Sequence, residues 1–296
     1  MAGLEGIHFM MPTPFDEEGM VNTESIPALV NLAVKAGCRG VVCLGVTGEV
    51  SRLTDAERKL VVETVIREVK QKLTVTVGTS AMGIEIAVQR SLEAKELGAT
   101  AVMMTPAPVA KQNLDAVFNY YEAVASAVNI PIVVQDYPRE SNVFMPPNFV
   151  ARLCQELDEV KYLKLEDPPT PPKITAIKKL VGDSLGIFGG LGGTFLYEEL
   201  NRGACGTMTG FAYPEILVKV YNHISRGETG NAAEVFYRYL PLIRYEFQEG
   251  IGLSLRKEVL KYRGILRCAK VRYPAAQIDE VTRQELYRLL ETLELT

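Results

Sequence analysis

The sequence of 296 residues lacks several patterns that would assign it to common classes of protein. Its five cysteines are scattered, odd in number and without a CxxC pair: Cys38, Cys43, Cys154, Cys205 and Cys268. Neither a disulfide framework nor a zinc site is therefore predicted, and we expect buried free thiols. The 32 basic and 36 acidic residues are interspersed, with a net charge of -4 and no basic run. This pattern argues against a nucleic-acid partner.

The sequence also lacks the signals of membrane insertion and secretion. No apolar stretch approaches the roughly 20 residues that a helix needs to cross a bilayer. The start, MAGLEGIHFMMPTPF, has neither the charged region nor the long apolar region of a signal peptide. We therefore expect a soluble, cytoplasmic protein that does not bind a membrane.

What the sequence does contain is an alternation of short apolar runs with amphipathic stretches, which is typical of βαβ units. Eight strands are predicted, over residues 6–13, 40–45, 74–79, 101–106, 130–137, 160–166, 185–190 and 206–210. Helical patterns lie near 23–36, 54–72, 83–97, 113–128, 146–156, 171–181 and 194–202. Thr54 and Glu57 fit a capping box at the start of one helix.

Eight strand-helix units favour a (β/α)8 TIM barrel over residues 1–212. A doubly wound open sheet is the alternative, but no GxGxxG or GxxxxGK[ST] follows the first strand. From Tyr213 onward the strand pattern stops, and the remaining residues read as successive helices. We expect this C-terminal helical region, 213–296, to be a cap or an oligomer contact rather than part of the catalytic site.

The stretch VKYLKLED, residues 160–167, carries a lysine inside an apolar strand. A buried ammonium group costs on the order of several kcal/mol unless it is paired or loses its proton. Strand alternation places Lys164 on one face with Tyr162 and Glu166, near the strand end where such barrels hold their active sites. A neutral, desolvated lysine can attack a ketone to form a Schiff base. An ion pair with Glu166 or Asp167 explains the lysine equally well from position alone.

A second candidate stretch, LGVTGEVSRLT at 44–54, follows the second predicted strand. Gly45 and Gly48 flank Val46 and Thr47, so the backbone could approach a ligand and present N–H groups to a carboxylate. Any strand-to-helix turn can use glycine, so this pattern alone is weak.

Two further stretches follow the fifth and seventh strands. In QDYPRESNV, residues 135–143, Gln135 and Tyr137 should face the same way. Tyr137 could transfer protons, or it could simply close the barrel mouth. In GIFGGLGGTF, residues 186–195, small residues such as Gly190 leave space for a ligand beside the lysine, although a tight turn explains them equally well.

Together these motifs resemble the dihydrodipicolinate synthase / N-acetylneuraminate lyase family of class I aldolases. The matching motifs are GVTGE at 45–49, the proline turn after the fifth strand, LKLED at 163–167, the glycine-rich end of the seventh strand and GTMTGFAYP at 206–214. The resemblance implies a barrel, usually a homotetramer, in which Lys164 forms a Schiff base with pyruvate or another 2-oxo acid. It further implies a substrate site formed by Val46, Thr47, Gly48, Glu49, Gln135, Glu166, Gly190 and Met208. Thr47 would hold the carboxylate.

Departures from the family's pattern indicate which branch of the family the sequence resembles. Dihydrodipicolinate synthases carry GTTGE, a tyrosine pair after the fourth strand and a tyrosine on the fifth strand. Here Val46 replaces a relay threonine, Ala107 and Pro108 replace the tyrosine pair, and Gln135 replaces the strand-five tyrosine. Glu140 stands where a substrate-binding arginine is expected. We therefore expect poor condensation of pyruvate with aspartate semialdehyde, and VVQDYP looks more like 2-keto-3-deoxyarabonate dehydratases.

The resulting hypothesis is a Schiff-base lyase that dehydrates or cleaves a 2-keto-3-deoxy sugar acid, with Lys164 as nucleophile and Tyr137 as proton shuttle. No metal or organic cofactor is required, because the imine is itself the electron sink. Two alternatives remain open. One is a true dihydrodipicolinate synthase with a rearranged relay, and the other is a non-catalytic family member that binds 2-oxo acids.

Overall fold

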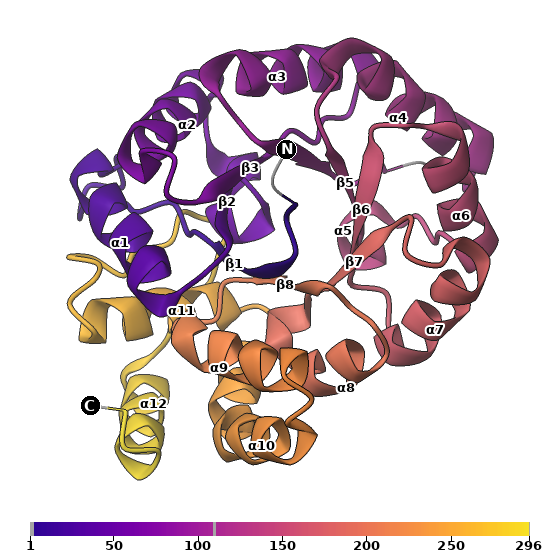
Figure 1. Ribbon diagram of the computed structural model, residues 1–296. Coiled ribbons are helices and arrows are strands. Elements are labelled where there is room, and N and C mark those ends of the chain that lie inside the picture. The colour runs from indigo at the N-terminus through magenta and orange to yellow at the C-terminus, as the bar shows by residue number, and fades with distance from the viewer. Residues whose placement is uncertain (1–2, 109–110, 296) are drawn as a thin grey trace.

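The computed structural model describes residues 3–108 and 111–295, and within these ranges eight parallel strands close into a barrel (Figure 1). The strands are β1 (Gly6–Met10), β2 (Gly40–Cys43), β3 (Thr74–Gly78), β4 (Ala101–Met104), β5 (Ile132–Asp136), β6 (Val160–Leu165), β7 (Gly186–Gly189) and β8 (Gly206–Thr209). β1 pairs with both β2 and β8, so the sheet has no edge. The predicted barrel is confirmed, and the open sheet is excluded.

Helices surround the strands on the outside, as the ring in Figure 1 shows. The ring consists of α1 (Ile26–Ala36), α2 (Asp55–Val69), α3 (Ile84–Leu97), α4 (Leu114–Val128), α6 (Pro147–Glu156), α7 (Thr170–Val181) and α8 (Leu196–Asn201), whereas the short α5 (Pro138–Ser141) lies inside the ring in Figure 1. The predicted capping box begins α2: the Glu57 amide donates to the Thr54 hydroxyl, and Glu57 accepts from the Thr54 amide at 2.9 Å. The short helix α5 was not predicted.

The C-terminal part of the chain forms α9 (Pro214–Ser225), α10 (Thr229–Glu246), α11 (Gly252–Tyr262) and α12 (Glu280–Thr292). α9 packs on β1 and α1 and so takes the place of the last helix of the ring. α10 packs on α9 outside the ring, and α11 and α12 contact α10. A domain boundary at residue 213 stays a prediction.

The inside of the barrel is filled by side chains and is not a channel. One apolar cluster there consists of Leu4, Met10, Val42, Ala101, Met103, Val133, Tyr162, Phe188 and Met208. Leu163 and Leu165 belong instead to the larger core that holds the helices against the strands. The side chains of β6 therefore alternate between the two cores, as strand geometry requires.

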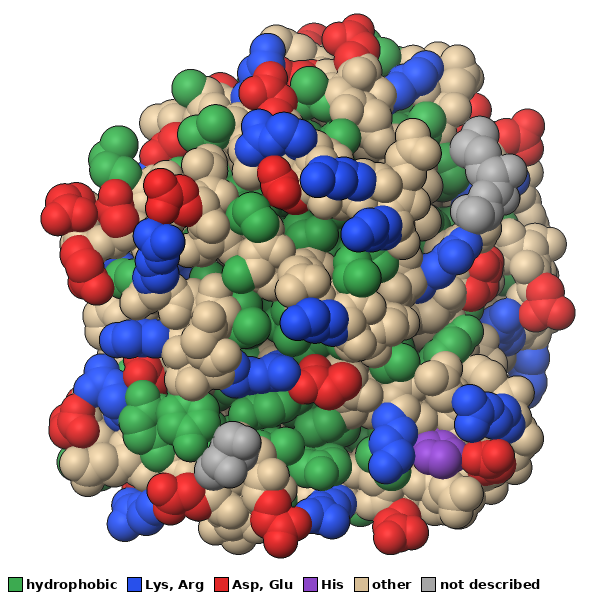
Figure 2. Space-filling view, turned by 60° about the vertical axis from the view of Figure 1, so that its left-hand side comes forward, with side chains coloured by type: hydrophobic (Ala, Val, Ile, Leu, Met, Phe, Trp, Pro, Cys, Tyr) green, Lys and Arg blue, Asp and Glu red, His purple; other side chains and the backbone are tan. Residues whose placement is uncertain are grey.

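The outer surface carries acidic and basic side chains side by side on the face shown in Figure 2. In the described part of the chain, none of the helices has the length and apolar character that a membrane span requires. The five cysteines are free thiols; Cys38, Cys43 and Cys268 are buried, whereas Cys154 and Cys205 are partly exposed.

Candidate active site

Lys164 lies inside the barrel near the carboxyl end of β6. It shares its register position with Gln135 on β5 and Phe188 on β7, and its side chain is 3% exposed. Its Nζ lies 2.8 Å from Oε2 of Glu166, which comes two residues later on the same strand face. The lysine is therefore both enclosed and ion-paired, so the two interpretations left open by the sequence are not exclusive.

Glu166 is the centre of the polar cluster around the lysine. Its Oε2 also accepts a hydrogen bond of 2.7 Å from Nε2 of Gln135, and its Oε1 accepts one of 3.2 Å from the backbone amide of Leu191. These donors hold the carboxylate beside Lys164. A glutamate fixed within 2.8 Å of an amine is within reach to take a proton from it.

Gly190 makes room for this carboxylate rather than for a ligand. A Cβ placed on Gly190 would lie 2.4 Å from Cγ of Glu166, which is closer than real Cβ atoms come. The space that the sequence suggested for substrate beside the lysine is thus occupied by Glu166. Position 190 therefore requires glycine because the Glu166 side chain packs against it.

Asp167 does not reach the lysine, because it is engaged elsewhere. Nζ of Lys173 on α7 lies 2.7 Å from Asp167 and 2.5 Å from Asp136, which ends β5. This bridge ties the carboxyl ends of β5 and β6 together. Burial raises the pKa of Asp136 to about 6, although Lys173 acts in the opposite direction.

A cavity of about 260 Å³ lies at this end of the barrel. Its walls come from the turn after β2, the turn after β5 and the chain between α10 and α11: Val46, Thr47, Arg52, Tyr137, Arg139, Glu246, Phe247, Gln248, Glu249, Gly250, Gly252, Leu253 and Arg256. Val46 and Thr47 lie in a single 3₁₀ turn, Val46–Gly48, directly after β2. Of the predicted site residues, Val46, Thr47 and Tyr137 line this cavity.

Tyr137 connects the cavity with the lysine cluster. Its backbone begins α5, and its side chain lines the cavity. Burial raises the pKa of the phenol, and the nearby charge of Glu166 raises it further. The phenol therefore keeps its proton at neutral pH, as a proton donor must.

Glu49 is not available to a substrate, in contrast to the expectation from the sequence. It is 1% exposed, and one carboxylate oxygen lies 2.5 Å from Nζ of Lys257 on α11. The other accepts from Arg52 at 3.0 Å and from the backbone amide of Arg272 at 2.8 Å. Glu49 therefore anchors the turn after β2 to the C-terminal region.

Gly48 and Met208 also have packing contacts rather than a place in the cavity wall. The Gly48 carbonyl accepts a 2.6 Å hydrogen bond from the hydroxyl of Thr13. Met208 is fully buried in the apolar cluster inside the barrel, with Met10 and Phe188. Neither residue lines the cavity. Both residues therefore contribute to the packing around the site rather than to the cavity wall.

The sequence analysis missed Glu246 and Arg256, which the C-terminal helices bring to the cavity. The C-terminal region was expected to cap the barrel or to contact other subunits, and in the structure it also supplies part of the cavity wall. The signal in the sequence was a basic residue, Arg256, next to apolar Leu255 on an amphipathic helix. Which face of α11 meets the barrel depends on long-range packing, and local periodicity does not specify it.

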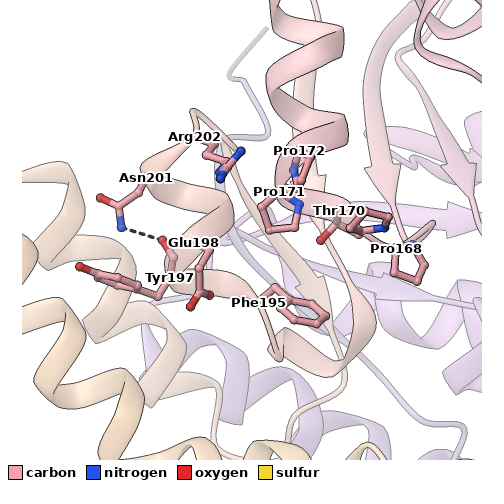
Figure 3. A pocket seen from close by; sticks show the side chains of 10 residues that line it. Pro168, Thr170, Pro171, Pro172, Phe195, Tyr197, Glu198, Asn201 and Arg202 are labelled. Atoms are coloured by element: carbon pink, nitrogen blue, oxygen red, sulfur yellow. Dashed lines mark hydrogen bonds between the residues drawn. The ribbon is translucent and has the colours of Figure 1, made fainter.

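A larger pocket, of about 880 Å³, lies outside the barrel between α7 and α8 (Figure 3). It is lined by Pro168, Pro169, Thr170, Pro171, Pro172, Phe195, Tyr197, Glu198, Asn201 and Arg202. The side chain of Asn201 donates to the backbone carbonyl of Tyr197 at 2.7 Å, as the dashed line in Figure 3 marks. This pocket contains neither the lysine cluster nor Tyr137 or the turn after β2, so its size does not make it the reaction site.

A closed (β/α)8 barrel with an enclosed lysine and a paired glutamate on its sixth strand has the features of a barrel enzyme that uses a lysine nucleophile. A model of the dihydrodipicolinate synthetase family matches residues 3–293. The chain belongs to the dihydrodipicolinate synthetase family.

Individual relatives carry two kinds of name. The chain is 30% identical to an L-2-keto-3-deoxyarabonate dehydratase of Azospirillum brasilense, covering 98% of this chain and 94% of that protein. It is 27% identical to a 4-hydroxy-tetrahydrodipicolinate synthase of Methanopyrus kandleri, covering 99% and 97%. A crystal structure of dihydrodipicolinate synthase from Rhodopseudomonas palustris superposes with a TM-score of 0.92 at 35% identity, covering 97% of each chain.

Proposed function

We propose that this protein is a Schiff-base lyase that removes water from a 2-keto-3-deoxy sugar acid, with Lys164 as the nucleophile. The observation that carries the proposal is the enclosed Lys164, whose Nζ lies 2.8 Å from Glu166 near the carboxyl end of β6. The similarity to a protein named L-2-keto-3-deoxyarabonate dehydratase supports the substrate class.

The first half of the mechanism forms the imine. Glu166 takes a proton from Lys164, and the neutral amine attacks the C2 carbonyl carbon of the 2-oxo acid. Glu166 returns the proton to the carbinolamine oxygen, which leaves as water, and a protonated imine links Nζ to C2. Thr47 in the cavity wall is the proposed partner of the substrate carboxylate.

The second half removes water from the substrate. The protonated imine withdraws electrons, so the Glu166 carboxylate can remove a proton from C3 to give an enamine. The enamine expels the C4 hydroxyl, which takes a proton from Tyr137 and leaves as water. The proton that Glu166 took from C3 then returns to the Tyr137 phenolate, so that both groups are restored. Hydrolysis of the imine then releases the product and restores Lys164. In a retro-aldol variant a base takes the proton of the C4 hydroxyl, and the C3–C4 bond breaks to give an aldehyde and the enamine. The enamine is protonated at C3, and hydrolysis of the imine releases pyruvate.

The experiment is a panel of 2-keto-3-deoxy sugar acids incubated with the protein and with Lys164→Ala. We expect one or more of these acids to lose one water, as detected by mass spectrometry, and Lys164→Ala to abolish the reaction while the fold is retained by circular dichroism. Turnover that persists in Lys164→Ala would refute the role of the lysine. No turnover of any acid, with binding retained, would indicate a non-catalytic member.

The synthase activity is the second candidate, favoured by the 35% identity to the structure described as a dihydrodipicolinate synthase. Consumption of aspartate semialdehyde in the presence of pyruvate would support it. The replacements at Val46, Ala107, Pro108 and Gln135 argue against it, because the family's relay threonine and tyrosines are absent from those positions. We further propose a homo-oligomer, a tetramer or a dimer, in the cytoplasm.

A further inference from the structure

Arg256 differs from the other two arginines of the cavity in having no anionic partner. Arg52 is bound to Glu49 at 3.0 Å, and Arg139 is bound to Glu249 at 2.5 Å. Within the described residues Arg256 forms no ion pair, and its buried Nε has no hydrogen-bond partner. The cavity therefore holds one arginine whose hydrogen-bonding capacity is left to a ligand.

Without a bound ligand, enclosing the guanidinium of Arg256 in this cavity is energetically unfavourable. Burial lowers the pKa of Arg256, which means that the charged guanidinium loses favourable contact with water. The nearby Glu246 offsets this in part, but one of its oxygens accepts a 3.1 Å hydrogen bond from the amide of Ala212 and the other has no partner among the described residues. Burial raises the pKa of Glu246 to about 7, so it is only partly ionised at neutral pH.

Arg256 lies beside Thr47 in the turn after β2, and both residues line the cavity. Its Cδ lies 3.7 Å from the point where a Cβ on Gly210 would stand, and Cγ2 of Thr47 lies 2.8 Å from the same point. Tyr137 lines the same cavity as Arg256, and the charge of Glu166 raises the pKa of Arg256, although less than that of Glu246 does.

The helix that carries Arg256 is fixed to the barrel by the next residue. Lys257 is fully buried, and its Nζ lies 2.5 Å from Glu49 in the turn after β2. Lys257 also donates to the carbonyl of Lys270 at 2.8 Å. Arg256 is thereby held in place before any ligand arrives, which lowers the entropy lost on binding.

We propose that Arg256 binds a carboxylate group of the 2-oxo acid in this site. The inference rests on the proposed function, because it takes the substrate to be the acid that reacts with Lys164. The planar guanidinium presents a fork of donors that matches a carboxylate. Every 2-oxo acid has a carboxylate at C1, and a diacid has a second carboxylate at its far end. Either carboxylate could bind the guanidinium of Arg256.

The experiment measures how much acid is needed to trap the imine on Lys164 with borohydride, using pyruvate and 2-oxoglutarate in parallel. Arg256→Met should raise the half-saturating concentration roughly 10- to 100-fold, which corresponds to the loss of charge-assisted hydrogen bonds. An increase for both acids assigns Arg256 to the C1 carboxylate, and an increase for 2-oxoglutarate alone assigns it to the far carboxylate. Arg256→Lys should recover part of the loss.

Arg139→Met is the comparison variant, because it removes a positive charge from the same cavity but from an arginine that already has a partner. A smaller change than in Arg256→Met supports specific contact by Arg256. Equal changes in the two variants, or no change in Arg256→Met for either acid, would overturn the proposal.

Two measurements distinguish carboxylate binding by Arg256 from a structural role of this residue and from failure of the proposed function. Arg256→Met should not lower the melting temperature, because it removes a partly buried cation that has no ion-pair partner within the described chain; a lower melting temperature with unchanged half-saturation would assign Arg256 a structural role instead. Calorimetric titration of Lys164→Ala with 2-oxoglutarate, with and without Arg256→Met, tests Arg256 without any imine. If the parent protein forms no adduct at all, the proposed function fails while this titration still decides the inference.

Discussion

At the residue scale, the site depends on how a few polar side chains are enclosed. Lys164 is tolerated inside the barrel because Glu166 lies 2.8 Å away, and Glu166 is held there by Gln135 and the amide of Leu191. The alternation of β6 made the shared face of Lys164 and Glu166 predictable from the sequence. The role of Gly190 was not predictable, because it depends on where a neighbouring strand places the Glu166 side chain.

Tyr137 gives a prediction at the same scale. Its raised pKa keeps the phenol protonated at neutral pH, so it can donate to a leaving hydroxyl. Tyr137→Phe should slow turnover of the sugar acid roughly 10²–10⁴-fold, the usual range for loss of an acid–base group. Steady-state rates on the acid identified by the panel provide the measurement.

The matched control is Tyr162→Phe, which removes a phenol from the same barrel. The Tyr162 hydroxyl accepts from the amide of Leu4 at 3.0 Å and belongs to the packed interior, away from the cavity. Its loss should leave the rate unchanged. An unchanged rate in Tyr137→Phe would assign proton transfer to another group.

At the scale of elements, the strands and helices agree closely with the sequence analysis because local patterns determine them. Each predicted strand is present, and most strands are one to a few residues shorter than predicted. The turn of residues 45–49 was expected to hold the carboxylate of a 2-oxo acid, chiefly through Thr47. Of these residues, only Val46 and Thr47 line the cavity. Glu49 instead pairs with Lys257 on α11, which lies 208 positions later in the sequence.

The contact between α8 and α7 carries a buried acid that gives a prediction about pH. Glu199 on α8 is fully buried, accepts a 2.5 Å hydrogen bond from Thr170 on α7, and has a pKa that burial raises to about 8. In the unfolded chain this carboxyl has its ordinary pKa of 4.5. Between these two values the unfolded state gives up the proton and the folded state keeps it, so the free energy of unfolding falls as pH rises.

Glu199→Gln removes this titration while keeping the shape of the side chain. The melting temperature of the variant should therefore rise relative to the parent as pH increases from 5 to about 8, and the difference should then level off. Thermal melts of the two proteins at the same series of pH values measure this difference. A difference that does not change with pH would contradict the raised pKa.

At the scale of the whole molecule, the C-terminal helices contribute to the wall of the cavity at the end of the barrel. α10, α11 and the chain between them form much of the cavity wall, and the pair of Lys257 with Glu49 fixes them to the turn after β2. The barrel could be predicted because eight similar units repeat along the chain. The contribution of Arg256 could not, because it depends on the packing of a distant helix and has no local motif.

The most direct test of the account is borohydride trapping with pyruvate, followed by peptide mapping of the added mass. We predict one adduct, on Lys164, and none in Lys164→Ala, because Lys164 is the enclosed lysine that faces Glu166 inside the barrel. An adduct on another lysine, or no adduct with pyruvate and with every longer 2-oxo acid, would contradict the claim that this lysine is enclosed in order to form an imine.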